Sequence, residues 1–189
     1  MTKFVELSRV VIAQAEVPAD YARSLVPYIR KIYSENKFKT REFNIWDHAE
    51  DSVFDQIKNA FVSTAQDLVR GHSNTVTDVS LDRSWARNYD DGDYIAPHIH
   101  GGNFIAGVVY LDVSEDSGDL LIQDPLAQYN WHSRNDKRTV GDGRVSMAIT
   151  PYTGLIVVMP GYLIHSSEPK PAGKRRFILS TNFNVRREN

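Results

Sequence analysis

The stretch YIAPHIHGGNFIAGVVYLDV, residues 94–113, places two histidines one residue apart, directly before a glycine pair and an apolar run. The run has the β-branched composition of a buried strand. If the preceding segment is extended, His98 and His100 point to the same face, because alternate residues of a strand share a face. Two explanations compete: a polar strand end, or two ligands of one metal ion such as Fe, Zn, Cu or Ni.

The rest of the chain divides into a helical part and a β-rich part. Amphipathic periodicity predicts two helices within residues 18–37 and 47–72, and residues 3–13 are β-prone. Short apolar runs separated by Gly, Pro, Asp and Asn then predict strands within residues 75–89, 103–113, 118–125, 143–149, 153–160 and 174–185. This order favours an α+β fold whose second half is a sandwich or barrel.

A single domain, 1–189, is expected: residues 1–75 supply an N-terminal strand and supporting helices, and residues 76–189 form the catalytic core. The first helix carries its apolar positions at helical spacing, and Pro27 is expected to kink it; these positions are Tyr21, Leu25, Tyr28, Ile29 and Ile32. Residues 126–142 form a long irregular connection, which favours a functional loop such as a lid.

Composition excludes several classes of function. The chain has no cysteine, which excludes disulfides, thiolate metal sites and a cysteine nucleophile, and fits a cytoplasmic location. The formal net charge of −2 gives no reason to expect nucleic-acid or membrane binding. No apolar run approaches the length of a transmembrane span or has the form of a signal peptide.

A third histidine and an arginine strengthen the metal hypothesis. His165 follows an apolar strand and a Pro-Gly turn, and Arg176 opens another strand eleven residues later. Three protein ligands on one side of a metal leave positions open for substrate and oxygen, as in non-haem Fe(II) oxygenases. A buried arginine beside such a metal would pair with a carboxylate, so a small diacid would bind the metal at one end and Arg176 at the other.

Four motifs in order resemble the 2-oxoglutarate- and Fe(II)-dependent dioxygenases of the prolyl-hydroxylase-like branch, and especially small bacterial and phage members. They are SWARNYDDGDYIAPHIH, AGVVYLDV, SGDLLIQDP and PGYLIHSSEPKPAGKRRFILSTNFN, and the resemblance covers roughly residues 76–185. It implies a double-stranded β-helix (jelly-roll, cupin-like) core, Fe(II) as the metal and 2-oxoglutarate as co-substrate. O2 would be consumed, and succinate and CO2 released, as the substrate is hydroxylated.

The resemblance assigns His98 as the first iron ligand and His165 as the distal one. The family generally has H-x-D, whereas the second position here is His100. An imidazole in place of a carboxylate leaves the ligand set neutral, so weaker metal binding and a favoured ferrous state are expected. A nearby carboxylate, Asp112 or Asp93, is the alternative third ligand.

The resemblance also assigns the residues that bind 2-oxoglutarate. Arg176 matches the arginine for the distal carboxylate, Tyr110 matches a tyrosine that helps hold it, and Tyr89 is a further candidate. Arg175 is the rival arginine, but Arg176 is in phase with the inward residues of the last strand.

The function expected is therefore an Fe(II)/2-oxoglutarate dioxygenase that hydroxylates a peptide or small-molecule substrate, with a prolyl or other amino-acid residue as the family-based hypothesis. Two alternatives stay open: a three-histidine, cupin-type metal dioxygenase that needs no 2-oxoglutarate, and a non-catalytic β-sandwich binding module. The sequence identifies neither the substrate, nor the oligomeric state, nor a phage or bacterial origin.

Overall fold

The computed structural model describes residues 11–35, 44–48, 51–71, 76–102, 105–125 and 146–187. In this part of the chain the elements are, in order, β1 (Ala13–Glu16), α1 (Ala19–Glu35), η1 (Ile45–Asp47), α2 (Asp51–Arg70), β2 (Val76–Asn88), β3 (Ile105–Val113), β4 (Leu120–Gln123), β5 (Ser146–Ile149), β6 (Leu155–Pro160), β7 (His165–Ser167) and β8 (Arg176–Arg187).

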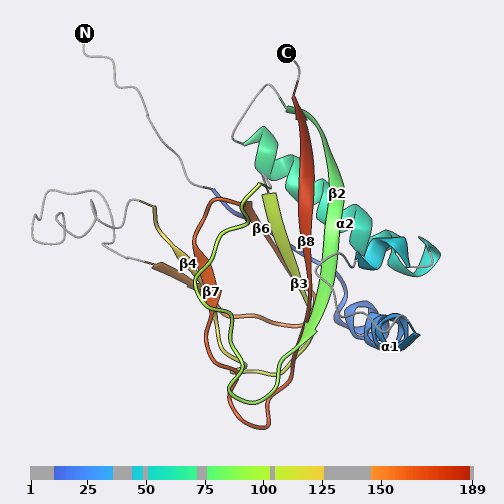
Figure 1. Ribbon diagram of the computed structural model, residues 1–189, viewed down its shortest axis with the longest axis vertical. Helices are drawn as coiled ribbons and strands as arrows, with labels where there is room; N and C mark the ends of the chain where they lie inside the picture. Colours follow the sequence, from blue (N-terminus) through green and yellow to red (C-terminus); the bar gives the residue numbers. More distant parts are fainter. Residues whose placement is uncertain are drawn as a thin grey trace, which may run out of the picture.

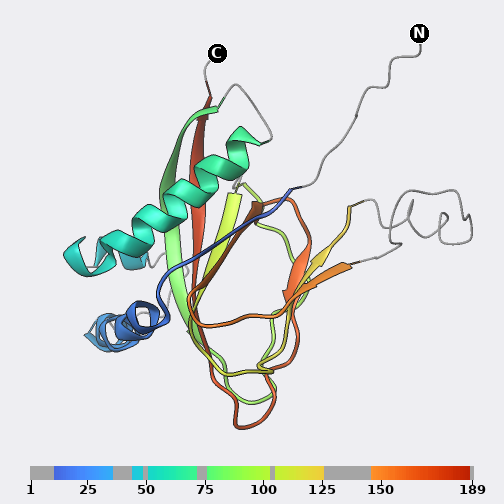
Figure 2. The same ribbon diagram turned by 180° about the vertical axis from the view of Figure 1, so that it is seen from behind.

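The strands form two antiparallel sheets that face each other (Figure 1). The larger sheet has the order β1-β6-β3-β8-β2, and the smaller one has the order β5-β4-β7. Both helices lie against the outer face of the larger sheet, as the view from behind also shows (Figure 2). The predicted α+β class with a double-stranded β-helix core is confirmed, and the helices are supporting elements outside it.

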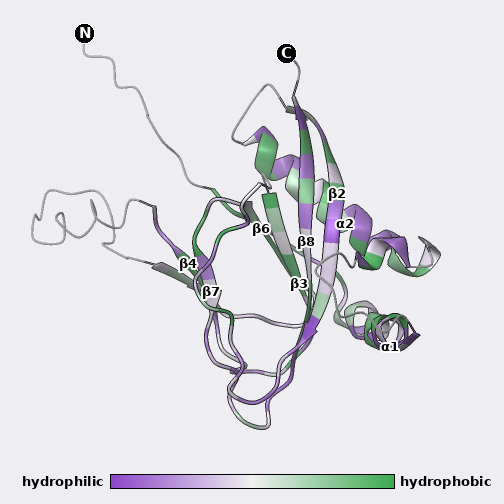
Figure 3. Ribbon diagram, viewed as in Figure 1, coloured by the Kyte–Doolittle hydropathy of each residue, from purple (hydrophilic) through white to green (hydrophobic). Residues whose placement is uncertain are grey.

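The helices pack on the sheet through one continuous apolar core. Leu25 and Ile29 of α1 and Ile57 and Phe61 of α2 are fully buried there, as is Phe183 of β8. Strands β3 and β6 are the most hydrophobic part of the larger sheet (Figure 3). Because β3 is covered by helices on one face and by the smaller sheet on the other, nearly all of its residues are buried, which explains its unbroken apolar run.

The first helix differs from its prediction in one detail. Tyr28, assigned to the apolar face, is 47% exposed, so that assignment was wrong. The buried positions of the helix are Ala22, Leu25, Ile29 and Ile32, so Tyr28 lies at the edge of this face. Helix α1 contains Pro27 in its interior, and the kink expected there stays a prediction.

A second apolar cluster fills the space between the two sheets. Val108 and Tyr110 of β3 point into it, whereas Val109 and Leu111 face the helices; after the register shift between Tyr110 and Asp112, Val113 joins it. Its other members come from β4, β6 and β8, among them Leu120, Met159 and Ile178. This inner layer is the floor of the cavity described below.

Several expectations fall at the limits of the described chain. Residues 1–10 lie outside the described part, so the edge strand expected within residues 3–13 stays a prediction; the edge strand β1 begins only at Ala13. The long connection, residues 126–142, also lies outside it. The second helix begins at Asp51, after the short helix η1. Neither described helix is both long enough and apolar enough to cross a membrane.

Strand β7 was not predicted from the sequence. It is only three residues long and follows a turn, so it offers no hydrophobic run that a periodicity argument could detect. It pairs with β4 on one side. On its other side it meets the segment that carries the paired histidines, through an isolated bridge between His98 and His165.

Candidate metal centre

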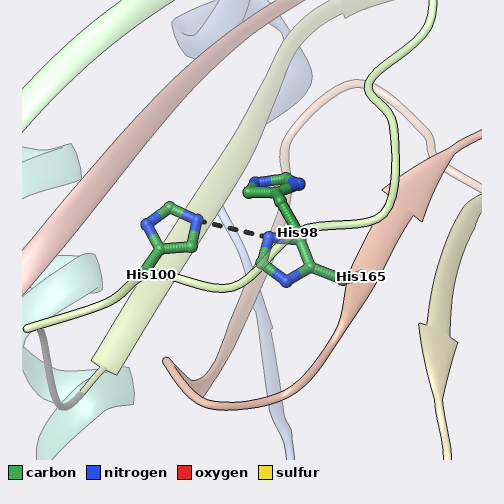
Figure 4. Close-up of side chains that lie close together, drawn as sticks. All are labelled: His98, His100 and His165. Atoms are coloured by element: carbon green, nitrogen blue, oxygen red, sulfur yellow. Dashed lines mark hydrogen bonds between the residues drawn. The ribbon is translucent and has the colours of Figure 1, made fainter.

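Three histidines from two distant segments meet at the mouth of the space between the sheets. His98 and His100 lie between β2 and β3, and His165 opens β7. One ligand nitrogen from each ring lies within 4.8 Å of the others, and the Nε2 atoms of His100 and His165 are 3.3 Å apart (Figure 4). The ring of His98 is 4.3 Å from that of His165 between centroids.

The paired histidines converge without lying in a regular strand, which corrects the premise of the sequence argument. His98 and His165 exchange two backbone hydrogen bonds of 3.0 Å, and His100 N–H donates to Gly161 O at 2.8 Å. The segment is thus extended and antiparallel to β7. Ile99, between the two histidines, is 52% exposed, so the alternation that turns both imidazoles inward is kept.

Backbone carbonyls fix the ring orientation of two histidines. Nδ1 of His98 is 2.9 Å from Ala96 O, and Nδ1 of His165 is 2.9 Å from Leu163 O. A carbonyl oxygen only accepts hydrogen bonds, so each Nδ1 carries the proton and each Nε2 carries a lone pair. Both rings therefore offer Nε2 as a ligand atom.

His100 is held in a different way, by a side chain. Its Nδ1 lies 2.7 Å from Oδ1 of Asn182 in β8, which leaves its Nε2 facing that of His165. Two nitrogen lone pairs that face each other at 3.3 Å repel unless a positive charge lies between or beside them. The donor set therefore fits a cation, and imidazole nitrogens suit a transition metal such as Fe(II).

Burial keeps His100 and His165 neutral, as ligation requires. It lowers the pKa of His165 to about 4, although the hydrogen bond to Leu163 O opposes the shift. Burial also lowers the pKa of His100, and the hydrogen bond with Asn182 opposes it. At neutral pH both rings are uncharged bases.

The carboxylates considered as alternative ligands point elsewhere. Oδ2 of Asp112 accepts a hydrogen bond of 3.0 Å from Nε of Arg175 at the surface. Oδ2 of Asp93 accepts from Nη2 of Arg87 at 3.4 Å and from the backbone N–H of Asp90 at 3.2 Å. Neither belongs to the histidine cluster found in the described part of the chain.

A cavity of about 110 Å³ extends from the histidines between the sheets. By volume it has room for several water molecules, and hence for a small ligand. Its apolar walls include Leu120, Met159 and Ile178. Its polar lining includes the histidines, a group formed by Tyr89, Tyr110 and Arg176, and the carboxylate of Asp119.

Arg176 is a buried cation without a carboxylate partner among the described residues. It is 2% exposed; Nη1 donates to Glu168 O at 2.9 Å, Nη2 donates to Ser117 O, and Nε has no partner. Its guanidinium carbon lies 4.8 Å from the ring centroid of Tyr89. Burial lowers the pKa of Arg176, so an anion in the cavity would relieve an unfavourable desolvation.

The two tyrosines keep their protons. Burial raises the pKa of Tyr110 well above its usual range and also raises that of Tyr89. Both hydroxyls are therefore neutral and able to donate a hydrogen bond. The rival Arg175 has a largely exposed side chain, paired with Asp112, whereas Arg176 lies in the wall of the cavity.

Three further residues complete the site and were missed in the sequence. Trp85 of β2 stacks on His100, with 6.0 Å between ring centroids and 22° between planes. Asn182 lies in phase with Arg176 on β8, but this phase alone does not distinguish it from other polar strand residues. Gly118, with φ +92°, lies so close to Arg176 that an added Cβ would overlap Nη2 and approach Pro169 O at 3.0 Å.

Fold and site together define a double-stranded β-helix protein with a cluster of three histidines that could hold a metal ion. A family model described as "Putative 2OG-Fe(II) oxygenase" matches residues 83–184, more than half of the chain. The chain belongs to this family of 2-oxoglutarate- and Fe(II)-dependent oxygenases, which confirms the resemblance. No curated protein sequence matches the chain.

Solved structures support the same fold. A prolyl-4-hydroxylase from Pseudomonas putida is 19% identical, with a TM-score of 0.59, and the match covers 95% of this chain and 89% of that one. The viral collagen prolyl hydroxylase vCPH from Paramecium Bursaria Chlorella virus-1 is 13% identical, with a TM-score of 0.58 and coverages of 91% and 94%. The non-heme alpha ketoglutarate dependent epimerase SnoN is 12% identical, with a TM-score of 0.64 and coverages of 93% and 78%.

Proposed function

We propose that this protein is an Fe(II)- and 2-oxoglutarate-dependent dioxygenase that hydroxylates a prolyl or other amino-acid residue. The observation that carries the proposal is the arrangement of one cavity. Three imidazole nitrogens with facing lone pairs lie at its mouth, and the uncompensated cation of Arg176 lies in its wall. A metal cation between the imidazole nitrogens would relieve the repulsion of their lone pairs, and a dianion in the cavity would compensate the charge of Arg176.

Each residue has a distinct role in this proposal. His98, His100 and His165 hold the iron through Nε2, and the bound iron with 2-oxoglutarate supplies the activation of O2 and the oxidising chemistry. Arg176 binds the distal carboxylate of 2-oxoglutarate, and Tyr110, assisted by Tyr89, donates a hydrogen bond to it. The apolar walls exclude water from the reacting groups.

The choice of substrate rests on the neighbours. Two of the similar structures are described as prolyl hydroxylases, and one of these as a collagen prolyl hydroxylase. Another is an epimerase, so the shared fold serves more than one reaction on different substrates. A prolyl or other amino-acid residue is accordingly the first substrate class to test, and the cytoplasmic location stays a prediction.

The neutral ligand set favours a second candidate, a three-histidine metal dioxygenase that does not use 2-oxoglutarate. The described cluster contains no carboxylate, and the terminal nitrogens of Arg176 already donate to Ser117 O and Glu168 O. In that case Arg176 would only hold two loops together. The unpartnered Nε of Arg176 in the cavity wall is the observation that puts this candidate second.

Anaerobic titration with Fe(II) and 2-oxoglutarate separates these candidates. We expect a weak visible charge-transfer band when both are present, and we expect Arg176→Gln to abolish it at the same co-substrate concentration. Arg175→Gln is the matched control, because its exposed side chain pairs only at the surface, and it should keep the band. Iron binding that 2-oxoglutarate leaves unchanged would favour the second candidate, and no iron binding would leave only a binding module.

A further inference from the structure

The three histidines differ in what orients their rings. His98 and His165 each donate from Nδ1 to the backbone carbonyl of the residue two positions earlier, so a backbone contact fixes the orientation of each ring. His100 instead makes its Nδ1 contact, at 2.7 Å, with Asn182, which is 82 residues away in sequence. Among the three, only His100 has its ring nitrogen held by a side chain that a point substitution can remove.

Asn182 lies on the same face of β8 as the group that would bind the co-substrate. Arg176, Ile178 and Ser180 line the cavity, and Asn182 continues this row at the two-residue period of a strand. The six positions that separate Asn182 from Arg176 correspond to about 20 Å of an extended strand. Asn182 is paired with Ala106 of β3, in the middle of the larger sheet, so its backbone is firmly placed.

Stacking alone does not decide which edge of the His100 ring faces the metal. Trp85 covers one side of the ring, and His165 stacks at 5.1 Å with 12° between planes. These contacts fix the ring plane, but turning the ring by 180° about its Cβ–Cγ bond would keep that plane and exchange the positions of its nitrogens and carbons. An in-plane partner at Nδ1 is what distinguishes the two orientations, and Asn182 supplies it.

We propose that Asn182 is the positioning residue for His100: its amide oxygen accepts the Nδ1–H and so presents the Nε2 lone pair to the metal. The inference rests on the proposed metal site and adds to it the residue that makes an imidazole usable where the family has a carboxylate. The opposite orientation, with the amide NH2 donating to Nδ1, puts the proton on Nε2 and removes His100 from the ligand set.

A carboxamide oxygen is a neutral acceptor, and this gives the proposal a distinctive consequence. Partners that accept from the outer nitrogen of a ligating histidine raise its basicity, and a carboxylate does so more strongly than an amide. Asn182→Asp is nearly isosteric and should keep or strengthen metal binding. Asn182→Leu keeps the volume but removes the acceptor, and it should weaken metal binding about 10- to 100-fold. A residue that merely fills space would not produce this order.

The test uses Zn(II), a diamagnetic probe, with the complete chain. Zn(II) affinity is measured by calorimetry, and nitrogen-detected NMR of the zinc-loaded protein reports the His100 Nδ1 proton. We expect that proton to exchange slowly in the wild type and in Asn182→Asp, and to be lost to rapid exchange in Asn182→Leu. The matched control is Asn184→Leu, two residues further along β8 with an exposed side chain, which should behave as the wild type.

The outcomes separate this inference from the proposed function. Zinc binding by the wild type that Asn182→Leu leaves within threefold overturns the role of Asn182 but not the metal site. A wild type that binds no zinc overturns the proposed function itself. If Asn182→Leu does not fold, the wild-type spectrum and Asn182→Asp decide, because a proton on Nε2 of His100, or a tenfold loss of affinity in Asn182→Asp, also refutes the inference.

Discussion

Replacing Gly118 by alanine should damage the co-substrate end of the cavity as well as the fold. The residue has φ +92°, which costs an L-residue about 1–3 kcal/mol. The added Cβ would also overlap Nη2 of Arg176, which donates to Ser117 O. If the guanidinium moves away and loses this charge-assisted hydrogen bond, about 1.5–3 kcal/mol more is lost. The two effects together predict a destabilisation of about 2.5–6 kcal/mol.

Gly92 offers a matched control for the strain alone. It has φ +82°, and an added Cβ would meet no atom within 4 Å. Gly92→Ala should therefore lose only about 1–3 kcal/mol, and each kcal/mol lowers the melting temperature of a chain of this size by about 2–4 °C. Urea unfolding measures the stability of both variants, and titration of the anaerobic iron protein measures their affinity for 2-oxoglutarate.

The two measurements should diverge between the variants. Gly92→Ala should bind 2-oxoglutarate like the wild type, whereas Gly118→Ala should bind it at least tenfold more weakly at a temperature where both are folded. Equal losses of stability, together with equal affinities for 2-oxoglutarate, would show that Arg176 does not depend on the space left by Gly118. The assignment of the arginine to the co-substrate would then lose its structural support.

Three further predictions concern the core and the histidines. The pKa of His165, about 4 in the fold against a usual 6.5, means that only the unfolded chain binds a proton between these values, so the stability of the metal-free protein should rise by roughly 3 kcal/mol from pH 4 to 6.5. His165→Gln should flatten that dependence in urea titrations at a series of pH values. His100→Asp adds a negative charge to the ligand set and should tighten Fe(II) binding in a competition titration; weaker binding would contradict the charge argument. Phe61→Ala, which empties a fully buried position 6.0 Å from the ring of Phe183, should cost about 3–5 kcal/mol by chemical denaturation.

The sequence predicted those elements whose apolar pattern is long enough to be periodic. Both helices and the strands β2, β3, β4, β5 and β6 lie within predicted segments, and β8 runs two residues past its own, because each carries its own hydrophobic face or run. The three-residue strand β7 carries none, and its place is set by pairing with β4 and with the segment around His98. Tyr28 shows a second limit of sequence prediction: periodicity alone does not reveal where the apolar face of a helix ends.

For the site, sequence motifs identified residues that the fold brings together, although one premise was wrong. The i, i+2 argument assumed a strand at His98 and His100, whereas a single bridge and one further hydrogen bond keep this segment extended. The choice between Arg175 and Arg176 followed from strand phase, and the structure places only Arg176 in the cavity wall. Asn182 was missed because an asparagine in a strand has no signal of its own until its partner is known.

The charge balance of the cavity gives a reason why an all-imidazole centre suits this chain. A ferrous ion held by three neutral rings would keep both of its charges, and Arg176 adds a third. Two carboxylates lie nearby: Asp119 in the cavity lining, and Glu168, whose charge acts on Arg176. An aspartate in place of His100 would add a further negative charge, and in a low-dielectric cavity each like charge makes the binding of a dianion more costly. The imidazole at position 100 would therefore favour a dianionic co-substrate beside Arg176.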